Sequence, residues 1–206
     1  MNENRKQSAI DGGEVSTSRL EMLTDGIFAI AMTLLVLEIH TPNKSLGNFN
    51  SQLLELWPHI FGFALSFIIL GMFWVAHQTE FKFIKKLDNT LIWLNIFYLL
   101  FVSLLPFSTA LLGQFYFVQS PVIIYGLHLI VLVLLQYWTW RHAFSRGSLV
   151  KEDAPAGLDR LAKRLCYAAV TAYIAALVIS FFSLPLTLLI YAIVPLPYIF
   201  GWIYKF

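Results

Sequence analysis

Six long apolar stretches, separated by short polar segments, dominate the pattern of hydrophobic and polar positions along this 206-residue chain. Each stretch can cross a hydrocarbon core of roughly 30 Å, which takes about 20 residues of α-helix. Pro58 and Pro121 agree with this division, because both fall in expected first turns, where a missing N–H does least harm. The pattern predicts an all-α polytopic membrane protein with six transmembrane helices, covering residues 19–40, 53–77, 90–117, 121–142, 161–182 and 184–203.

Three features complete this organisation. Residues 1–18 form a polar N-terminal tail, and residues 19–206 form a single transmembrane domain. The first apolar run exceeds the 7–15 residues of a signal-peptide core and has no small-residue cleavage site after it, so we expect it to be retained as an anchor. Pro106 predicts a kink in the third helix, while Pro195 and Pro197 interrupt the sixth and leave its end the least defined boundary.

Composition supports this assignment and excludes other classes. Hydrophobic residues make up 58% of the chain and charged residues 13%, against roughly 25% in soluble proteins. The net charge of +2 and the position of the bases at the edges of apolar runs argue against a nucleic-acid partner. Cys166 is the only cysteine, and no span carries two histidines with i, i+4 spacing, so neither a disulfide nor a metal site is expected. No nucleotide or other cofactor motif is present.

The basic residues predict the orientation. With six spans, nearly all lysines and arginines fall on one side, and only Lys44 falls on the other. Because basic residues gather in cytoplasmic loops, both termini should be cytoplasmic in a multi-pass protein of the cell membrane. The residues that define this side are Arg5, Lys6, Arg19, Lys82, Lys85, Lys86, Arg141, Arg146, Lys151, Arg160, Lys163, Arg164 and Lys205.

The first helix has two distinct faces. An advance of about 100° per residue places Ile30, Thr33, Leu34 and Leu37 in one stripe, and Asp25 nearly opposite. The aliphatic face either packs against lipid or another helix, or lines a pore. The spacing alone leaves both possibilities open.

Asp25 needs a partner, because an ionisable residue within a membrane is costly. Trp74, His77 and Asn95 lie at the same predicted depth on the second and third helices. A buried network of these four side chains has two interpretations. It is either a structural lock that joins three helices, or a proton relay or gating latch.

The first half of the sequence resembles a known family. Arg19, three further residues and then Leu23-Thr24-Asp25 resemble the signature of the first helix in the transmembrane protein 175 family of potassium channels, where phenylalanine and serine precede the aspartate. Gln78 stands where that family often has a second histidine. The resemblance continues through residues 73–77, 93–95 and 105–109.

The resemblance implies a homotetramer in which the first helix of each subunit lines a pore for K⁺ and other monovalent cations. It implies that Ile30, Leu34 and Leu37 form an apolar constriction and that Thr33 supplies a hydroxyl layer. It also implies a signature network of Arg19, Thr24, Asp25, Trp74, His77 and Asn95.

Such a pore would differ from one with a carbonyl filter, and the chain has no TVGYG segment. A narrow apolar ring closes by losing its water, and a wider one passes ions that keep most of their hydration, so we expect modest K⁺ over Na⁺ selectivity. Glu38, near the outer end of the first helix, either concentrates cations at the pore mouth or is a solvated interfacial residue.

Other functions remain as alternatives. A secondary transporter or a proton-conducting channel using the Asp25 and His77 network would also fit a polytopic chain, but the Asp25 signature is not duplicated as in transporters with internal repeats. An intramembrane enzyme would need a nucleophile beside Asp25 and His77, and none is evident, so an enzyme is not expected. A structural membrane module is the last alternative.

Overall fold

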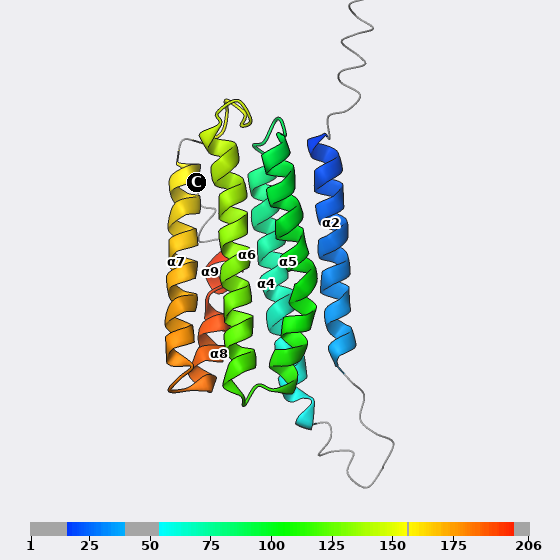
Figure 1. The fold of residues 1–206 in the computed structure, drawn as a ribbon, viewed down its shortest axis with the longest axis vertical. Helices are drawn as coiled ribbons and strands as arrows, with labels where there is room; N and C mark the ends of the chain where they lie inside the picture. The colour runs from blue at the N-terminus through cyan, green and yellow to red at the C-terminus, as the bar shows by residue number, and fades with distance from the viewer. Residues whose placement is uncertain (1–15, 40–53, 156, 200–206) are drawn as a thin grey trace, which may run out of the picture.

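The helices run side by side along one long axis in the computed structural model of the chain, which describes residues 16–39, 54–155 and 157–199 (Figure 1). Short turns join antiparallel neighbours, for example α5 with α6 and α7 with α8. The elements in chain order are α2 (Thr17–Leu34), the 3-10 helix η2 (Leu35–Glu38), α4 (Trp57–Phe81), α5 (Asn89–Gln114), α6 (Gln119–Ser145), α7 (Leu158–Ile179), α8 (Leu184–Ile193) and α9 (Leu196–Ile199).

Five of these segments are long and apolar enough to cross a membrane, and they coincide with the first five predicted spans to within about four residues. The all-α, multi-pass architecture is thereby confirmed. The predicted sixth span is only partly described: α8 has ten residues, ends before Pro195 and is followed by the short α9. The expected end of this span at residue 203, like residues 1–15 of the expected tail, lies outside the described residues.

Local sequence explains several helix ends. The Ser16 hydroxyl accepts a hydrogen bond from the Arg19 backbone N–H, so α2 begins two residues before the predicted boundary. Asp88 caps α5 in the same way, accepting from the Leu91 N–H at 2.8 Å.

Pro106, where the sequence predicts a kink, lies inside α5, and the helix continues through it. A proline removes one backbone donor and crowds the preceding turn. His128 of α6 lies against this region, with Nε2 2.8 Å from the Phe101 carbonyl oxygen and Nδ1 2.9 Å from the Ser108 hydroxyl. A polar side chain of the neighbouring helix therefore bonds to α5 on both sides of the proline.

α2 packs at one side of the bundle, against α5 and α4, while α6 lies between α5 and α7 (Figure 1). The main core is continuous from Phe28 of α2 and Leu35 of η2 to Tyr173 of α7 and Tyr191 of α8. A smaller core lies at the end of the bundle opposite the α7–α8 turn. At this end, an isolated antiparallel bridge between Ile84 and Val150 joins the α4–α5 connection to the α6–α7 connection.

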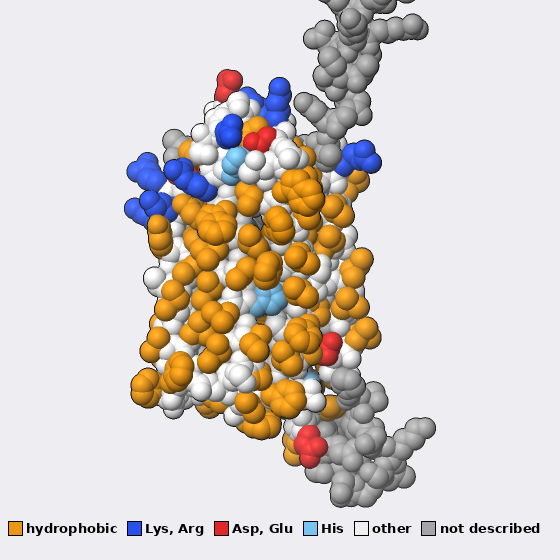
Figure 2. All heavy atoms as spheres, in the orientation of Figure 1, with side chains coloured by type: hydrophobic (Ala, Val, Ile, Leu, Met, Phe, Trp, Pro, Cys, Tyr) orange, Lys and Arg blue, Asp and Glu red, His pale blue; other side chains and the backbone are white. Residues whose placement is uncertain are grey.

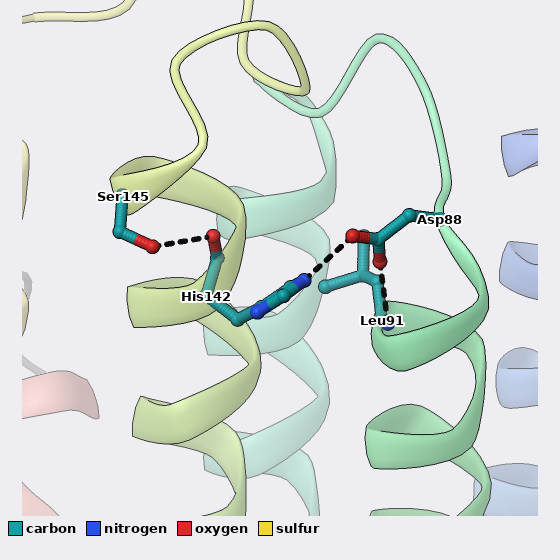
Figure 3. Close-up of polar contacts among 4 residues, drawn as sticks. All are labelled: Asp88, Leu91, His142 and Ser145. Carbon is teal, nitrogen blue, oxygen red and sulfur yellow. Dashed lines mark hydrogen bonds and ion pairs between the residues drawn. The ribbon is translucent and has the colours of Figure 1, made fainter.

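Lysine and arginine side chains gather at this same end of the molecule, whereas hydrophobic side chains cover its flanks (Figure 2). There, Asp88 at the start of α5 and His142 near the end of α6 point toward one another, with His142 Nε2 2.7 Å from the Asp88 carboxylate (Figure 3). Partial burial opposes ionisation of Asp88, but the Leu91 N–H, His142 and Arg146 together hold the pKa of its carboxyl below the ordinary value of 3.8.

Candidate functional site

The two predicted faces of α2 have different environments. The face toward α4 and α5 carries a run of buried side chains: Leu20, Thr24, Phe28, Ala31 and Leu35. Its aromatic member, Phe28, packs against Tyr98 of α5 with ring centroids 6.0 Å apart. This face holds α2 on the rest of the subunit.

The aliphatic stripe, which we define as Ile30, Thr33, Leu34 and Leu37, has no cover within the described subunit. Ile30 is 60% exposed, Leu34 41% and Leu37 67%, and Thr33 is also exposed. The Thr33 hydroxyl donates to the Ile30 carbonyl oxygen at 2.8 Å. Its hydrogen is therefore used within the helix, and the lone pairs of its oxygen stay free to face a cation.

Three members of the predicted network form a buried chain of hydrogen bonds, here called the inner group: Thr24, Asn95 and His77. Asn95 Nδ2 donates to the Thr24 hydroxyl oxygen at 3.1 Å, and Thr24 in turn donates to the Leu20 carbonyl oxygen at 2.9 Å. His77 Nε2 lies 2.9 Å from Asn95 Oδ1. All three side chains are buried, so the group joins α2, α5 and α4 inside the subunit.

The hydrogen bonds fix the His77 tautomer. Because the Asn95 amide nitrogen faces Thr24, its oxygen accepts from His77 Nε2, which must carry the hydrogen. Within the described residues, the other ring nitrogen, Nδ1, is buried without a hydrogen-bond partner. The ring itself is stacked 4.0 Å from Phe81 and 5.9 Å from Tyr98, so aromatic surfaces cover both of its faces.

Asp25 belongs to a separate outer group with Trp74 and Gln78. Trp74 Nε1 donates to Asp25 Oδ1 at 2.8 Å, and Gln78 Nε2 donates to the same oxygen. The outer group is exposed, and within the described residues no hydrogen bond joins Asp25 to His77 or Asn95. The single network expected from the sequence is therefore two groups on adjacent faces of α2.

Sequence reasoning noted Gln78 only as a departure from the family pattern. Its role follows from its spacing, because Trp74 and Gln78 are four residues apart and share one face of α4. Both can therefore reach one carboxylate on a neighbouring helix.

The two remaining predicted residues lie at opposite ends of the first span. Arg19, in the first turn of α2, has an exposed side chain that makes no hydrogen bond or ion pair with the described part of the chain. Glu38 ends η2 and is half-buried. Five of the six residues of the signature network therefore lie in the inner and outer groups, and Arg19 lies in neither.

Residues 19–106 match the family described as the endosomal/lysosomal potassium channel TMEM175. A protein of Streptomyces collinus that is named a potassium channel is 31% identical over 193 residues, which cover 90% of this chain and 92% of that protein. The chain belongs to the TMEM175 family. The family resemblance noted in the sequence is thus confirmed, and the family is one of ion channels rather than enzymes.

Two further TMEM175 comparisons differ in extent. A potassium channel of Chryseobacterium is 34% identical over 117 residues, covering 57% of this chain and 59% of that protein. The crystal structure of a lysosomal potassium-selective channel TMEM175 homolog from Chamaesiphon minutus is similar with a TM-score of 0.77 and 28% identity, over 89% of this chain and 96% of that one. The TMEM175 fold therefore extends well beyond the 19–106 segment.

Proposed function

We propose that this chain is the subunit of a potassium-permeable cation channel of the cell membrane. The observation that carries the proposal is the aliphatic stripe on α2 and η2, a set of apolar side chains that the subunit leaves uncovered. Relatives named as potassium channels, one of them similar over nearly the whole chain, support K⁺ as the permeant ion.

The proposed channel is a homotetramer with α2 of each subunit lining the pore, because one helix cannot enclose a conduit. Rings of Ile30, Leu34 and Leu37 form an apolar constriction that closes by losing its water. The Thr33 oxygens replace part of a cation's hydration next to that constriction, which gives modest selectivity for K⁺ over Na⁺. Glu38, which directly follows Leu37, raises the local cation concentration at the pore mouth.

In this proposal the inner and outer groups hold α2 in place and do not carry protons. A relay from Asp25 would have to pass through His77, and the two residues belong to separate groups of hydrogen bonds. The inner group instead fixes the rotation of α2, and this rotation decides which side chains face the pore.

The proposed topology has six spans, with α8 and α9 contributing to the sixth, and both termini in the cytoplasm. It follows from the gathering of basic side chains at one end, under the positive-inside rule. Ser120 and Ser148 are exposed at opposite ends of α6, so each offers a test position. A cysteine at position 120 should react with an impermeant thiol reagent added outside cells, and one at 148 should not. The reverse labelling would invert the topology, and the wild type with its buried Cys166 is the control.

Potassium flux in liposomes tests the pore assignment directly. Replacing Ile30 with asparagine puts four amides in the constriction, which should wet more easily, so resting flux should rise several-fold and K⁺ over Na⁺ selectivity should fall. Ala29→Asn is the matched control, because Ala29 is also exposed but lies about 100° away around α2. Both proteins should assemble at four times the 23.6 kDa subunit mass.

Equal flux and reversal potential for Ile30→Asn and the wild type, at normal tetramer yield, would remove Ile30 from the pore wall. A monomer that conducts would exclude the tetrameric architecture itself.

A further inference from the structure

A second candidate site lies on the opposite side of the subunit from the aliphatic stripe. A partly open cavity of about 80 Å³ lies between α4, α6 and α7, with Val194 as its one lining residue beyond these helices. No residue of α2 lines it. We call it the α4–α6–α7 cavity, and it has no part in the pore proposed above.

One acidic side chain stands in the apolar wall of this cavity. Glu80, near the end of α4, is hydrogen-bonded to the Gln136 amide, and the Gln136 oxygen is 3.4 Å from the Tyr98 hydroxyl that donates to it. Among the described residues that line the cavity, none is a lysine, arginine or histidine. A carboxylate in such a setting is costly unless a cation pairs with it, and a neutral amide does not supply that charge.

Aromatic side chains form part of the cavity wall. The rings of Phe73, Tyr137 and Trp140 line the cavity and would attract a cation through their faces.

A neighbouring cavity offers an approach from the basic end of the molecule. It shares Thr79, Leu158 and Leu161 with the α4–α6–α7 cavity and is lined as well by Lys82 and Phe83. The shared residues make the two cavities adjacent, so a small molecule entering between α4 and the start of α7 can reach Glu80.

We propose that the α4–α6–α7 cavity binds an organic amine cation that carries an apolar group. The ammonium group pairs with the Glu80 carboxylate, and the apolar group lies in the space between α6 and α7. A lipid acyl chain would satisfy the apolar wall but would leave the Glu80 carboxylate without a cation, so charge complementarity favours the amine.

The test compares two probes of the same shape: 4-phenoxybutylamine, which is cationic at neutral pH, and 4-phenoxybutanol, which is neutral. Calorimetry on the detergent-solubilised full chain should show that the wild type binds the amine about tenfold more tightly than the alcohol. Glu80→Gln should remove most of this preference while leaving the affinity for the alcohol unchanged. Equal affinities for the two probes in the wild type, or unchanged amine binding by Glu80→Gln, would overturn the proposal.

Two further measurements keep the test decisive if Glu80→Gln fails to fold. Ala162 lines the cavity from α7, so Ala162→Phe should fill it and abolish binding of both probes, whereas Ala168→Phe on the exposed face of α7 should bind normally. The sole cysteine, Cys166, also lines the cavity, and the amine should slow its reaction with N-ethylmaleimide. Normal binding by Ala162→Phe, or no protection of Cys166 at saturating amine, would place the probe elsewhere. Neither outcome depends on whether the protein conducts ions.

Discussion

In the α2–α4–α5 half of the bundle, the described hydrogen bonds between helices join side chain to side chain, whereas in the α6–α8 half they run from side chains to backbone carbonyls, beside one ion pair between Arg141 and Asp159. Asn95 joins Thr24 to His77 in the first half. In the second half, the Tyr191 hydroxyl donates to the Val122 carbonyl oxygen and Thr187 donates to the Ala176 carbonyl oxygen. Bonds between side chains need particular residues at both ends, while a carbonyl is present in every residue.

This difference accounts for where the family resemblance lies. The segment that matches the TMEM175 family, residues 19–106, covers most of the half in which hydrogen bonds between helices join two side chains. In the other half, a side chain that bonds to a backbone carbonyl does not require a particular residue as its partner. We therefore expect substitutions in the two halves to destabilise the protein for different reasons.

The largest loss of stability should come from a steric clash in the α6–α8 half. A Cβ at Gly126 of α6 would overlap the Tyr191 hydroxyl and come within 2.8 Å of the Leu177 side chain. Gly126→Ala should therefore push α8 away from α6 and break the bond to Val122, at a cost of about 3 kcal/mol. The unfolding temperature in detergent should fall accordingly.

Gly71→Ala provides the matched control, because a Cβ at Gly71 meets nothing within 4 Å. Alanine also favours a helix over glycine, so this variant should be as stable as the wild type or slightly more stable. Equal stability of the two alanine variants would mean that α8 does not pack on α6 as described.

The next largest loss of stability should come from replacing one buried polar side chain in the α2–α4–α5 half. Asn95→Leu leaves both ring nitrogens of the buried His77 without a partner among the described residues, at a cost of about 2 kcal/mol. Because the leucine also frees the rotation of α2, tetramer yield should fall together with the unfolding temperature.

Asp25→Asn is the comparison within the same half. The asparagine oxygen can still accept from Trp74, and the outer group is exposed, so the loss should stay below about 1 kcal/mol. A larger loss for Asp25→Asn than for Asn95→Leu would reverse the ranking of the two groups. Normal assembly of both variants with loss of pH-dependent conductance would favour the proton relay instead.

The fold was largely predictable because membrane spans need long apolar runs, and five of the six predicted stretches became helices of spanning length. The sixth was harder to predict. Pro195 lies inside an apolar stretch and separates α8 from α9, because proline has no backbone N–H to continue a helix. A hydropathy pattern does not detect this missing donor.

The sequence predicted that the stripe and Asp25 lie on different faces of the first helix, but it did not predict which side chains are hydrogen-bonded to one another. Helical spacing placed the aliphatic stripe apart from Asp25, and the stripe is part of the exposed surface of α2 and η2, as Asp25 itself is. Spacing gives no relative rotation between helices, so it did not show that Asp25 bonds to Trp74 and Gln78 while Asn95 takes His77. The cavity at Glu80 depends on three helices at once, and none of its residues forms a pattern in the sequence.

The smallest effect should come from Asp88, which links the two halves where α5 begins and α6 ends. Asp88→Asn keeps a good helix cap for the Leu91 N–H but loses the charge that pairs with His142, so stability at neutral pH should fall by less than about 1 kcal/mol. The folded pKa of Asp88 lies below its ordinary value, so its ionised form stabilises the fold above about pH 4, and that contribution is lost as the pH falls through the lowered pKa. Thermal unfolding of the wild type and Asp88→Asn between pH 7 and pH 2 should therefore give curves that differ at pH 7 and meet at the acidic end. A difference that grows toward acidic pH would mean that the carboxyl acts through its protonated form, and that the contact between α5 and α6 is not an ion pair.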